Sequence, residues 1–591
     1  MKDTIIQLLT QAVNSLQSQG LIPKEISPSI VVEHSRDKQH GDLASNIALI
    51  LAKAAARKPR ELAELLVQHL PPSNSVTKVE IAGPGFINFY LNPAVRFDVI
   101  KTILESGTEF GRSNKGVGRR IHIEFVSSNP TGPLHVGHGR GAAYGAAVAD
   151  LLEIIGCTVH REYYVNDAGR QMDILTASIW LRYLELCGEK FNFPSNGYKG
   201  EYIKDIASHL QKEQNNKLQH SMQNVFKNVP EDASPTDIAD TGKADAHIDA
   251  LIINAKNLLG QEHYQFIFNL GLNTILQDIK EDLAEFGVVY QNWFSERSLK
   301  TEGAVDRALE KLRSAGHIYE NEGALWFRAT AFGDEKDRVV VRKNGDITYF
   351  AADIAYHMNK YERGFTDIID IVGSDHHGYI PRVIAAMKAF NYSTESLTAL
   401  LVQFATLYRG KERVPMSTRG GQFVTLRELR EEVGKDAARF FYVLRKAEQH
   451  MDFDLDLAKS QSQDNPVYYI QYAHARISSV MRQLTEKHLT WDKALGLTAL
   501  DKLNTHHEEA LLTTINRFTE TVEIAALQYE PHILAHYLRD LAQQFHTYYN
   551  AEQFLVEDEI LRNARLCLIA ATQQVFANGL KLLGVSAPHA M

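Results

Sequence analysis

The stretch from 121 to 165 constrains the fold of this chain more than any other. It begins with the alternating apolar run Ile121-His122-Ile123-Glu124-Phe125, which predicts a strand, and continues into a loop of small residues and two prolines. Beyond His135-Val136-Gly137-His138-Gly139, apolar residues recur every three or four positions up to Gly156, as in an amphipathic helix. Residues 158–165 then predict a second strand. These elements form a βαβ unit, and its turn lies where α/β sheets bind ligands.

The turn at 135–139 has the composition of a nucleotide-binding site. Gly137 and Gly139 lack side chains, so a ligand can approach the backbone, and the helix amino terminus offers free N–H groups. His135 and His138 add imidazoles that can bind phosphate oxygens as charge develops during nucleotidyl transfer. Alternatively, the two histidines could be zinc ligands or ordinary polar residues. No cysteine or acidic residue with ligand spacing follows nearby, so we expect no protein-held metal here.

A resemblance to a known family rests on this same stretch. His135-Val136-Gly137-His138 resembles the HIGH signature of class I aminoacyl-tRNA synthetases, a short motif that other nucleotidyltransferases share. The preceding run, Glu124-Phe125-Val126-Ser127-Ser128-Asn129-Pro130-Thr131-Gly132-Pro133-Leu134, is similar to the bacterial arginyl-tRNA synthetases in particular. Together the two runs are far more specific than the four-residue motif.

Composition limits the class of protein and its compartment. A chain of 591 residues is too long for one core and predicts about three or four domains. A net charge of −9 argues weakly against a nucleic-acid partner, although local basic faces decide such binding. The three cysteines are scattered, which favours a reducing compartment. We find no run of eighteen apolar residues, so we expect a cytoplasmic protein without a membrane span.

Residues 1–92 predict a separate α+β domain. Its expected elements are helices at 5–16, 43–56 and 61–70 and strands at 30–33, 76–81 and 86–91. In the family resembled, an appended domain with a segment like Gly41–Asn46 contacts the outer corner of the tRNA. Residues 93–120, with four glycines, are expected to link this domain to the next.

The remaining sequence predicts one interrupted α/β domain and a helical domain. The first half of a Rossmann-like catalytic domain spans 121–187, a mainly helical insertion spans 188–287, and the second half spans 288–451. That half has a predicted hairpin at 326–342 and predicted strands at 367–372 and 400–404. Residues 452–591 predict an all-α bundle.

Three acidic residues are candidates for an amino-acid pocket. Tyr349 and Asp353 share one face of a predicted helix, where a carboxylate and a phenol could hold a guanidinium; the pair alone more often means an exposed Asp and a core Tyr. The resemblance to the family's Tyr-x-x-x-Asp pattern implies the pocket. It also implies that Glu296, in Trp293-Phe294-Ser295-Glu296, lines it, and that Glu124 and Asn129 hold the amino acid.

The loop 409–421 occupies the place of the second class I signature, KMSKS, and departs from it. Pro415 and Thr418 stand where the two lysines are expected, which leaves Met416, Ser417 and Arg419 for ATP binding. A glycine-bounded basic loop can close on a triphosphate. Arg419, then Arg413, then Lys411 are our candidates for the mobile positive charge, with Mg²⁺ sharing the load.

The helical domain carries an aromatic and basic stripe. Tyr469, Tyr472 and Arg476 have helical spacing and could stack on unpaired tRNA bases, although such a stripe is more often part of a core. Gln471-Tyr472-Ala473-His474-Ala475-Arg476 and the ending Leu583-Gly584-Val585-Ser586-Ala587-Pro588 also resemble the family, which implies an anticodon-binding bundle.

The resemblance covers nearly the full length and implies a monomeric arginine–tRNA ligase. Such an enzyme makes arginyl-adenylate from arginine and Mg-ATP and transfers arginine to the terminal ribose of its tRNA. Three alternatives are a class I synthetase for another amino acid, a nucleotidyltransferase for small molecules, and a non-catalytic tRNA-binding relative. The last is disfavoured because His135, His138 and Asp353 are all present.

Overall fold

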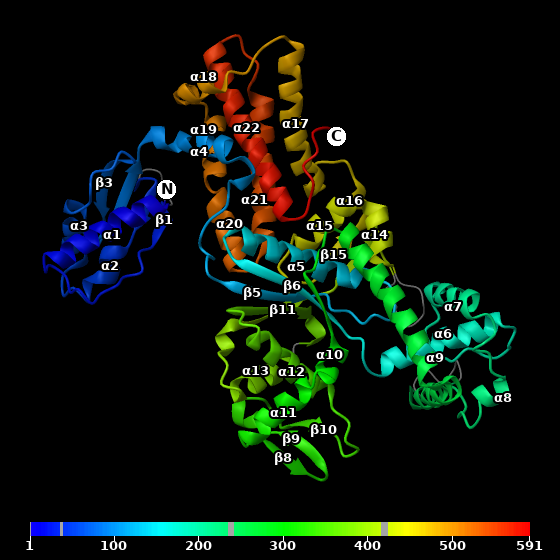
Figure 1. The fold of residues 1–591 in the computed structure, drawn as a ribbon. Coiled ribbons are helices and arrows are strands. Elements are labelled where there is room, and N and C mark those ends of the chain that lie inside the picture. Colours follow the sequence, from blue (N-terminus) through cyan, green and yellow to red (C-terminus); the bar gives the residue numbers. More distant parts are fainter. Residues whose placement is uncertain (1, 36–39, 234–240, 377, 415–423) are drawn as a thin grey trace. The chain divides into compact units, whose positions relative to one another are not determined.

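A computed structural model describes residues 2–35, 40–233, 241–376, 378–414 and 424–591 (Figure 1). The chain forms two compact units, each built from segments far apart in sequence. One unit contains Met1–Phe110, Val480–Arg517 and Gln544–Val575, and the other contains Gly111–Ser479, Phe518–Gln543 and Phe576–Met591. Helices α17 (Pro466–Glu486), α21 (Pro531–Ala551) and α22 (Glu559–Leu582) cross the boundaries of these segments.

The amino-terminal region is α+β, as predicted. An antiparallel sheet of order β1-β2-β4-β3 packs with three helices around a core that includes Leu9, Ile47 and Phe89. The predicted helix at 43–56 is wrong over its first turn, because Leu43–Ser45 pairs with β4 as a strand. The elements are α1 (Lys2–Ser18), β1 (Val32–His34), β2 (Leu43–Ser45), α2 (Ile47–Ala52), α3 (Pro59–Gln68), β3 (Val76–Ala82) and β4 (Phe86–Leu91).

The same unit contains helices from the middle and the end of the sequence. The segment that was expected to be a linker begins with a helix, α4 (Pro93–Ser106). Glu508 and Arg565 form a buried ion pair 2.8 Å long. The carboxylate of Glu508 also accepts a hydrogen bond from the hydroxyl of Tyr548. The further elements are η2 (Gly107–Glu109), α18 (Lys493–Thr498), η6 (Leu500–Lys502) and α19 (His506–Asn516).

The second unit contains a five-stranded parallel sheet of order β12-β11-β5-β6-β7. Its strands are β5 (Arg120–Phe125), β6 (Thr158–Val165), β7 (Asn292–Ser295), β11 (Asp367–Gly373) and β12 (Leu397–Val402). Figure 1 shows α5 (Val136–Ile154) on one face of the sheet and α12 (Tyr349–Glu362) with α13 (Ile380–Ala389) on the other. The predicted βαβ unit is confirmed as β5-α5-β6.

The strand order reverses between β5 and β11. From β5 the chain proceeds outward through β6 and β7, and it returns to the other side of β5 as β11 and β12. In doubly wound sheets the crevice at such a reversal, beyond the carboxyl ends of the strands, binds ligands.

Two insertions interrupt this sheet. The first contains α6 (Arg170–Leu186), α7 (Glu201–Gln214), α8 (Met222–Val225) and α9 (Thr241–Glu285), and α9 is broken by non-helical dihedral angles at Gly260. The second contains α10 (Glu296–Thr301), α11 (Ala304–Ser314), β8 (Ile318–Asn321), β9 (Ala324–Phe327), η3 (Ala329–Phe332) and β10 (Arg338–Val341). The predicted hairpin is confirmed, since β9 pairs with both β8 and β10 in an antiparallel sheet.

The second unit also contains a smaller, three-stranded sheet and several short helices. The strands of this sheet have the order β14-β13-β15. The elements are η4 (Ser374–His376), η5 (Thr394–Ser396), β13 (Ala405–Arg409), β14 (Glu412–Arg413), α14 (Leu426–Val433), α15 (Lys435–Val443), β15 (Met451–Asp454), α16 (Leu455–Lys459) and α20 (Phe518–Leu527).

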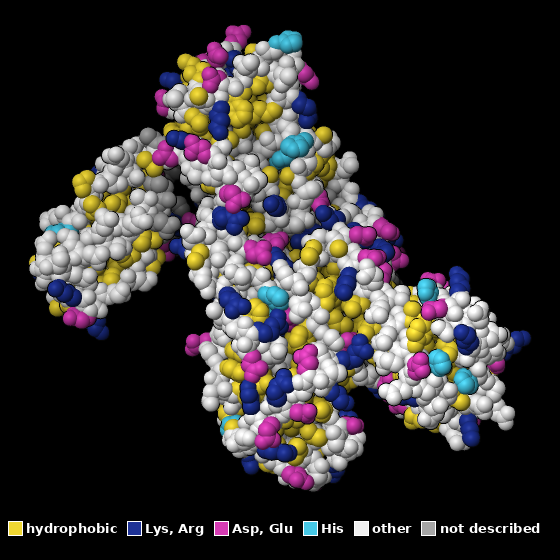
Figure 2. Space-filling view, viewed as in Figure 1, with side chains coloured by type: hydrophobic (Ala, Val, Ile, Leu, Met, Phe, Trp, Pro, Cys, Tyr) yellow, Lys and Arg dark blue, Asp and Glu magenta, His cyan; other side chains and the backbone are white. Residues whose placement is uncertain are grey.

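The surface mixes charges of both signs. On the face shown in Figure 2, Lys and Arg side chains are interspersed with Asp and Glu, consistent with the modest net charge of −9. Within the described residues, no helix is both long enough and apolar enough to cross a bilayer.

Two glycines of α5 test how tightly this helix packs on the sheet. A Cβ atom at Gly145 would lie 2.3 Å from the buried ring of Phe125, whereas one at Gly141 would meet nothing within 4 Å. We expect Gly145→Ala to destabilise the protein by about 1–3 kcal/mol through overpacking. Gly141→Ala, its control in the same helix, should be neutral or stabilise by up to about 1 kcal/mol. Urea-unfolding midpoints measure both; equal midpoints would contradict the packing described.

Candidate active site

The first turn of α5 and the last residue of β11 lie around one aromatic ring. Phe404 would be 3.1 Å from a Cβ atom on Gly137, which follows β5, and 3.5 Å from one on Gly373, the last residue of β11. The turn at 135–139 and the end of β11 therefore border the same crevice, at the reversal of strand order.

The two histidines of the turn are held by the backbone at the start of α5. His135 is the N-cap, and its Nδ1 accepts a hydrogen bond from the N–H of Gly137 at 3.0 Å. His138 Nδ1 accepts from the N–H of His135 at 3.3 Å, and the ring centroids are 3.7 Å apart. Because each Nδ1 is an acceptor, each neutral ring carries its proton on Nε2.

Burial keeps both imidazoles neutral. It lowers the pKa of His135, and it lowers the pKa of His138 to about 3, with a further contribution from His135. The turn therefore presents two Nε2–H donors together with the partial positive charge of a helix amino terminus. This is a site for an anion that accepts hydrogen bonds.

The glycines of the turn also have a packing role. A Cβ atom on Gly139 would lie 2.8 Å from both Leu426 and Tyr442, so at this residue the missing side chain makes room for protein atoms. A Cβ atom on Gly137 would lie 2.7 Å from the ring of His135. Only glycine at these positions permits the observed arrangement of the turn.

The turn pairs with the chain that follows the second signature segment. Val136 donates to the carbonyl of Val424 at 3.1 Å, and Leu426 donates to the carbonyl of Leu134 at 2.8 Å. Met416, Ser417 and Arg419 lie outside the described residues. Of the other candidate cations, Arg413 lies in β14, paired with Tyr408, and Lys411 lies in the preceding turn.

A cavity of about 80 Å³ lies between the sheet and α12. It can hold a compact polar head group. Its lining includes two of the predicted pocket residues, Glu124 of β5 and Asp353 of α12. The other lining residues are Tyr164, Tyr356, His357, Asp370, Val372, Tyr379, Ile380, Val383, Leu397 and Ala399.

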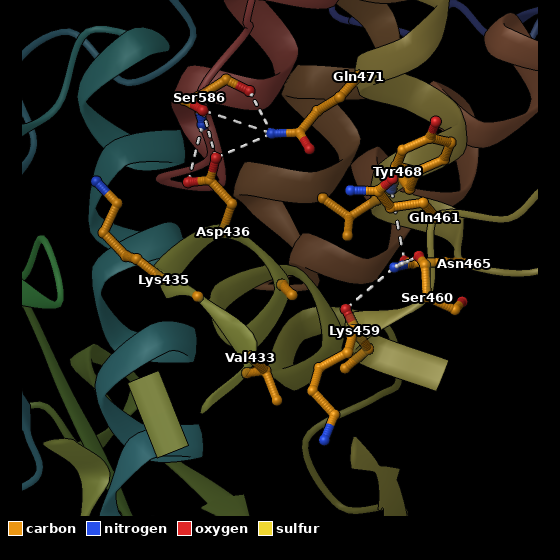
Figure 3. A pocket seen from close by; sticks show the side chains of 14 residues that line it. Val433, Lys435, Asp436, Lys459, Ser460, Gln461, Asn465, Tyr468, Gln471 and Ser586 are labelled. Carbon is orange, nitrogen blue, oxygen red and sulfur yellow. Dashed lines mark hydrogen bonds between the residues drawn. The ribbon is translucent and has the colours of Figure 1, made fainter. Parts of the chain in front are cut away.

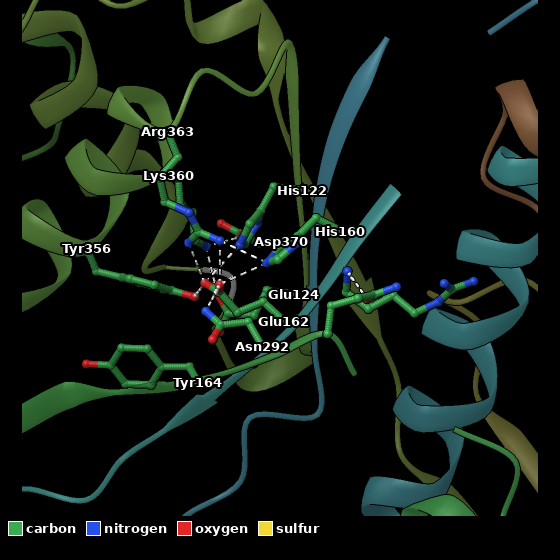
Figure 4. Close-up of polar contacts among 12 residues, drawn as sticks. His122, Glu124, His160, Glu162, Tyr164, Asn292, Tyr356, Lys360, Arg363 and Asp370 are labelled. Carbon is green, nitrogen blue, oxygen red and sulfur yellow. Dashed lines mark hydrogen bonds and ion pairs between the residues drawn. The ribbon is translucent and has the colours of Figure 1, made fainter. Parts of the chain in front are cut away.

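Lys360 forms ion pairs with two of the carboxylates at this cavity (Figure 4). Its side chain is 0% exposed, and its Nζ lies 2.6 Å from Glu124 Oε2 and 2.7 Å from Asp370 Oδ1. His357 Nε2 lies 2.9 Å from the other oxygen of Asp370. Although burial opposes it, Lys360 together with His357 lowers the pKa of Asp370. Glu124 and Asp370 therefore already have an ion-pair partner within the protein, the ammonium of Lys360.

A second group of buried charges lies beside the first. Glu162 of β6 is fully buried and is bonded by His122 at 2.9 Å, by Arg363 at 2.8 Å and by Asn292 at 2.6 Å. Tyr356 of α12 donates to the same carboxylate at 2.8 Å. Figure 4 shows the two groups side by side, with the polar face of α12 turned toward the strands.

Asp353 and Glu296 differ from these matched carboxylates. Burial, with the neighbouring Glu124 adding to it, raises the pKa of Asp353 to about 6; Tyr379 donates a hydrogen bond to it. Burial and the charge of Asp353 raise the pKa of Glu296, which is 8% exposed, to about 7. Neither has an ion pair among the described residues, so this pair of acids is a site for a cation.

The remaining predicted pocket residues are at the surface. Asn129 is exposed and bonds Gln171 and Asn166 through its amide. Tyr349 is 59% exposed and is absent from the cavity lining; its hydroxyl would lie 3.0 Å from a Cβ atom on Gly169. The spacing of Tyr349 and Asp353 is helical as expected, but only Asp353 faces the cavity.

Several functional candidates escaped the sequence interpretation, chiefly Lys360, Asp370 and Tyr379. A signal was present: Asp353, His357 and Lys360 recur on one face of a helix, and Asp370 interrupts an apolar strand. Ionisable residues on the sheet-facing side of two elements imply that they pair with each other.

On α17, the aromatic and basic stripe is half-buried. Tyr469, Tyr472 and Arg476 retain intermediate exposure, and the guanidinium of Arg476 lies 4.5 Å from the ring centroid of Tyr472. Tyr472 also stacks on Tyr468. In the part of the chain that the structure describes, no three His, Cys, Asp or Glu side chains gather as a metal site would require.

Comparison with known proteins agrees with this geometry. Three family models match consecutive parts of the chain: "Arginyl tRNA synthetase N terminal domain" at residues 3–91, "tRNA synthetases class I (R), catalytic domain" at 99–452, and "DALR anticodon binding domain" at 470–591. The chain is similar to the arginine–tRNA ligase of Thioalkalivibrio sulfidiphilus, with 59% identity over 100% of both chains. With that of Coxiella burnetii it shares 55% identity over 100% of this chain and 99% of the relative.

Solved structures share the fold. The arginyl-tRNA synthetase of Thermus thermophilus superposes with a TM-score of 0.73 at 23% identity over 100% of both chains. That of Plasmodium falciparum superposes with a TM-score of 0.70 at 15% identity, over 99% of this chain and 98% of the other. The predicted fold class is confirmed: a Rossmann-like core, an α+β amino-terminal domain and a helical carboxyl-terminal region. With full-length relatives above half identity and all three of its domains matched, the chain belongs to the arginyl-tRNA synthetase family, the arginine–tRNA ligases.

Proposed function

We propose that Asp353, which lines the cavity beside α12, binds the guanidinium of arginine together with Glu296, which does not line the cavity but is close enough for the charge of Asp353 to raise its pKa. The observation that carries this proposal is their unmatched charge: Glu296 is buried and Asp353 half-buried, both have raised pKa values, and neither has an ion pair among the described residues. A planar guanidinium offers donors to two carboxylates at once, whereas an ammonium is a point charge. A lysine side chain in this cavity would therefore leave buried acceptors unmatched, which supports rejection of lysine.

Glu124, Asn129 and Tyr349 complete the proposed amino-acid site. Glu124 lines the cavity, with its carboxylate fixed by Lys360 at 2.6 Å and Ser127 at 2.9 Å. Asn129 follows β5, and Tyr349 lies beside Gly169 beyond β6, at the carboxyl ends of neighbouring strands. We assign these two exposed residues to the polar end of the amino acid, nearer the nucleotide.

We further propose that the turn at 135–139 binds ATP. The Nε2–H groups of His135 and His138 donate to phosphate oxygens, and the backbone at Gly137 and Gly139 borders the nucleotide. Met416, Ser417 and Arg419 remain candidates for the phosphates from outside the described residues, with Arg419 replacing the usual lysine. Mg²⁺ enters with ATP; it takes most of its ligands from phosphate and water, so it requires no cluster of protein ligands.

These groups position the reaction without a protein nucleophile. A carboxylate oxygen of arginine attacks the α-phosphorus of ATP, the bond to the bridging oxygen breaks, and pyrophosphate leaves with the electron pair. A terminal ribose hydroxyl of the tRNA then attacks the carbonyl carbon of arginyl-adenylate, and AMP leaves. The protein contributes alignment of the reactants and neutral donors for the phosphate charge.

The other partners and the cellular context follow from the same assignment. We propose that Tyr469, Tyr472 and Arg476 contact the tRNA, because they combine half-exposed aromatic rings with a cation on one helix. We also propose that the enzyme acts in the cytoplasm as a monomer. Its three free cysteines are compatible with a reducing compartment.

Replacement of Asp353 tests the guanidinium contact. Asp353→Asn should raise KM for arginine about 10- to 100-fold, since a charge-assisted hydrogen bond contributes about 1.5–3 kcal/mol. It should also weaken discrimination against lysine in ATP–pyrophosphate exchange with tRNA present. The control is Glu362→Gln at the end of the same helix, where the carboxylate bonds Lys311 at the surface. If Asp353→Asn keeps both properties of the wild type, the assignment is wrong.

The raised pKa values predict a pH dependence of arginine binding. Above pH 7 both acids are ionised and attract the guanidinium; as pH falls through about 7 and then about 6, Glu296 and Asp353 take up protons and lose that charge. KM for arginine should therefore rise on acidification, by up to roughly tenfold per unit for each group. KM for ATP, measured in the same series, is the control. Arginine affinity that stays constant from pH 8 to pH 5.5 would exclude these two carboxyls.

Two substitutions of His138 separate its roles. Asn places an acceptor near the position of Nδ1 and preserves the cap, whereas Gln places a donor near the position of Nε2. We expect His138→Asn to lower kcat/KM for ATP about 10²- to 10³-fold, and His138→Gln to retain more activity, because the phosphate donor is what matters. Pyrophosphate exchange measures both. Equal activity of the two variants would contradict the proposed donor.

A further inference from the structure

Helix α15 (Lys435–Val443) carries polar side chains that contact three distant parts of the second unit. Asp436, Arg439 and Tyr442 occur at every third position; Tyr442 bonds the nucleotide turn, and the other two both bond the 583–588 segment. Because one short helix carries all three, a displacement at one end is transmitted to the other.

Tyr442 connects this helix to the nucleotide turn. Its buried hydroxyl donates to the carbonyl of Val136 at 2.9 Å, between His135 and Gly137. Its ring also fills the space beside Gly139. Tyr442 therefore fixes the peptide whose neighbours hold the two imidazoles.

Arg439 connects the middle of the helix to the 583–588 segment. It is 0% exposed, and its Nε donates to the carbonyl of Leu583 at 3.3 Å, while its Nη1 donates to that of Gly287 at 3.1 Å. Gly584 has φ +70, and any side chain there would collide with the guanidinium. The chain after α22 is thus closely fitted against α15.

Asp436 connects the start of the helix to the same segment and to α17 (Figure 3). Its carboxylate accepts from the N–H of Ser586 at 3.2 Å, from the hydroxyl of Ser586, and from Gln471 Nε2 at 2.9 Å. Gln471 also donates to the carbonyl of Ser586 at 3.0 Å. A cavity of about 450 Å³ opens at this junction, and Ser586 is exposed.

We propose that α15 is a positioning helix for the ATP-binding turn, and that the junction of Asp436, Ser586 and Gln471 sets the affinity for ATP through Tyr442. This inference rests on the proposed binding of ATP by His135 and His138. Loss of the Ser586 contacts frees the start of α15, and the Tyr442 hydroxyl then holds Val136 less well.

The test compares KM for ATP with KM for arginine in pyrophosphate exchange with tRNA present. Ser586→Ala and Tyr442→Phe should each raise KM for ATP about three- to tenfold, the size of one hydrogen bond, and leave KM for arginine unchanged. The variant Ser586→Thr, which keeps the hydroxyl, should have the same KM for ATP as the wild type. The double variant Ser586→Ala/Tyr442→Phe should resemble a single variant, because both changes act through one helix; independent sites would multiply their effects.

A matched control is Tyr183→Phe, which removes another buried hydroxyl that donates to a backbone carbonyl, that of Asn215 at 2.6 Å in the first insertion. It should leave KM for ATP unchanged. The inference is overturned if Ser586→Ala leaves KM for ATP unchanged, or if the double variant shows the product of the single effects. Failure of the proposed ATP site itself is distinguishable, because His138→Asn would then leave kcat/KM for ATP unaltered.

Discussion

The ion pairs of Lys360 are the interaction on which the cavity between the sheet and α12 depends. Its buried ammonium joins α12 to both β5 and β11, the two strands at which the sheet reverses order. A buried carboxylate without its partner costs several kcal/mol, and Lys360 is a cause of the lowered pKa of the buried Asp370. Glu124 and Asp370 share this one ammonium, whereas Asp353 and Glu296 have no ion pair among the described residues.

Buried arginines hold the surrounding loops through hydrogen bonds to backbone carbonyls instead of ion pairs. Arg140 of α5 donates to the carbonyls of Gln403, Lys446 and Gln449, and Arg439 likewise bonds carbonyls. Carbonyl acceptors satisfy a guanidinium without adding a negative charge. The fold therefore uses carboxylates where charge must be balanced beside the substrate and carbonyls where segments need only to be joined.

The sequence predicted those features that local pattern determines. The β5-α5-β6 unit, its histidine turn and the hairpin of β9 and β10 follow from periodicity and glycine placement. The strand at Leu43–Ser45 did not, because three residues become a strand only through pairing with β4. The pairing of Lys360 with Glu124 was missed for a related reason: the two residues are 236 positions apart, so the ionisable face of α12 indicates that Lys360 has a buried partner without showing that this partner is Glu124. Asp353 was predicted as a pocket residue through the family resemblance and lines the cavity, whereas the exposed position of Tyr349 depends on the tertiary packing of α12.

The reversal of strand order also affects how the protein is made. Hydrogen bonds between the neighbouring strands β5 and β11 join residues as much as 246 positions apart, so β5 leaves the ribosome long before its partner. At synthesis rates of roughly 5–20 residues per second, that interval is on the order of ten to fifty seconds. Throughout it, one edge of β5 lacks its final neighbour, which is the condition under which strands pair wrongly. The catalytic crevice is thus a late product of translation, and the nascent chain is most vulnerable to aggregation before it forms.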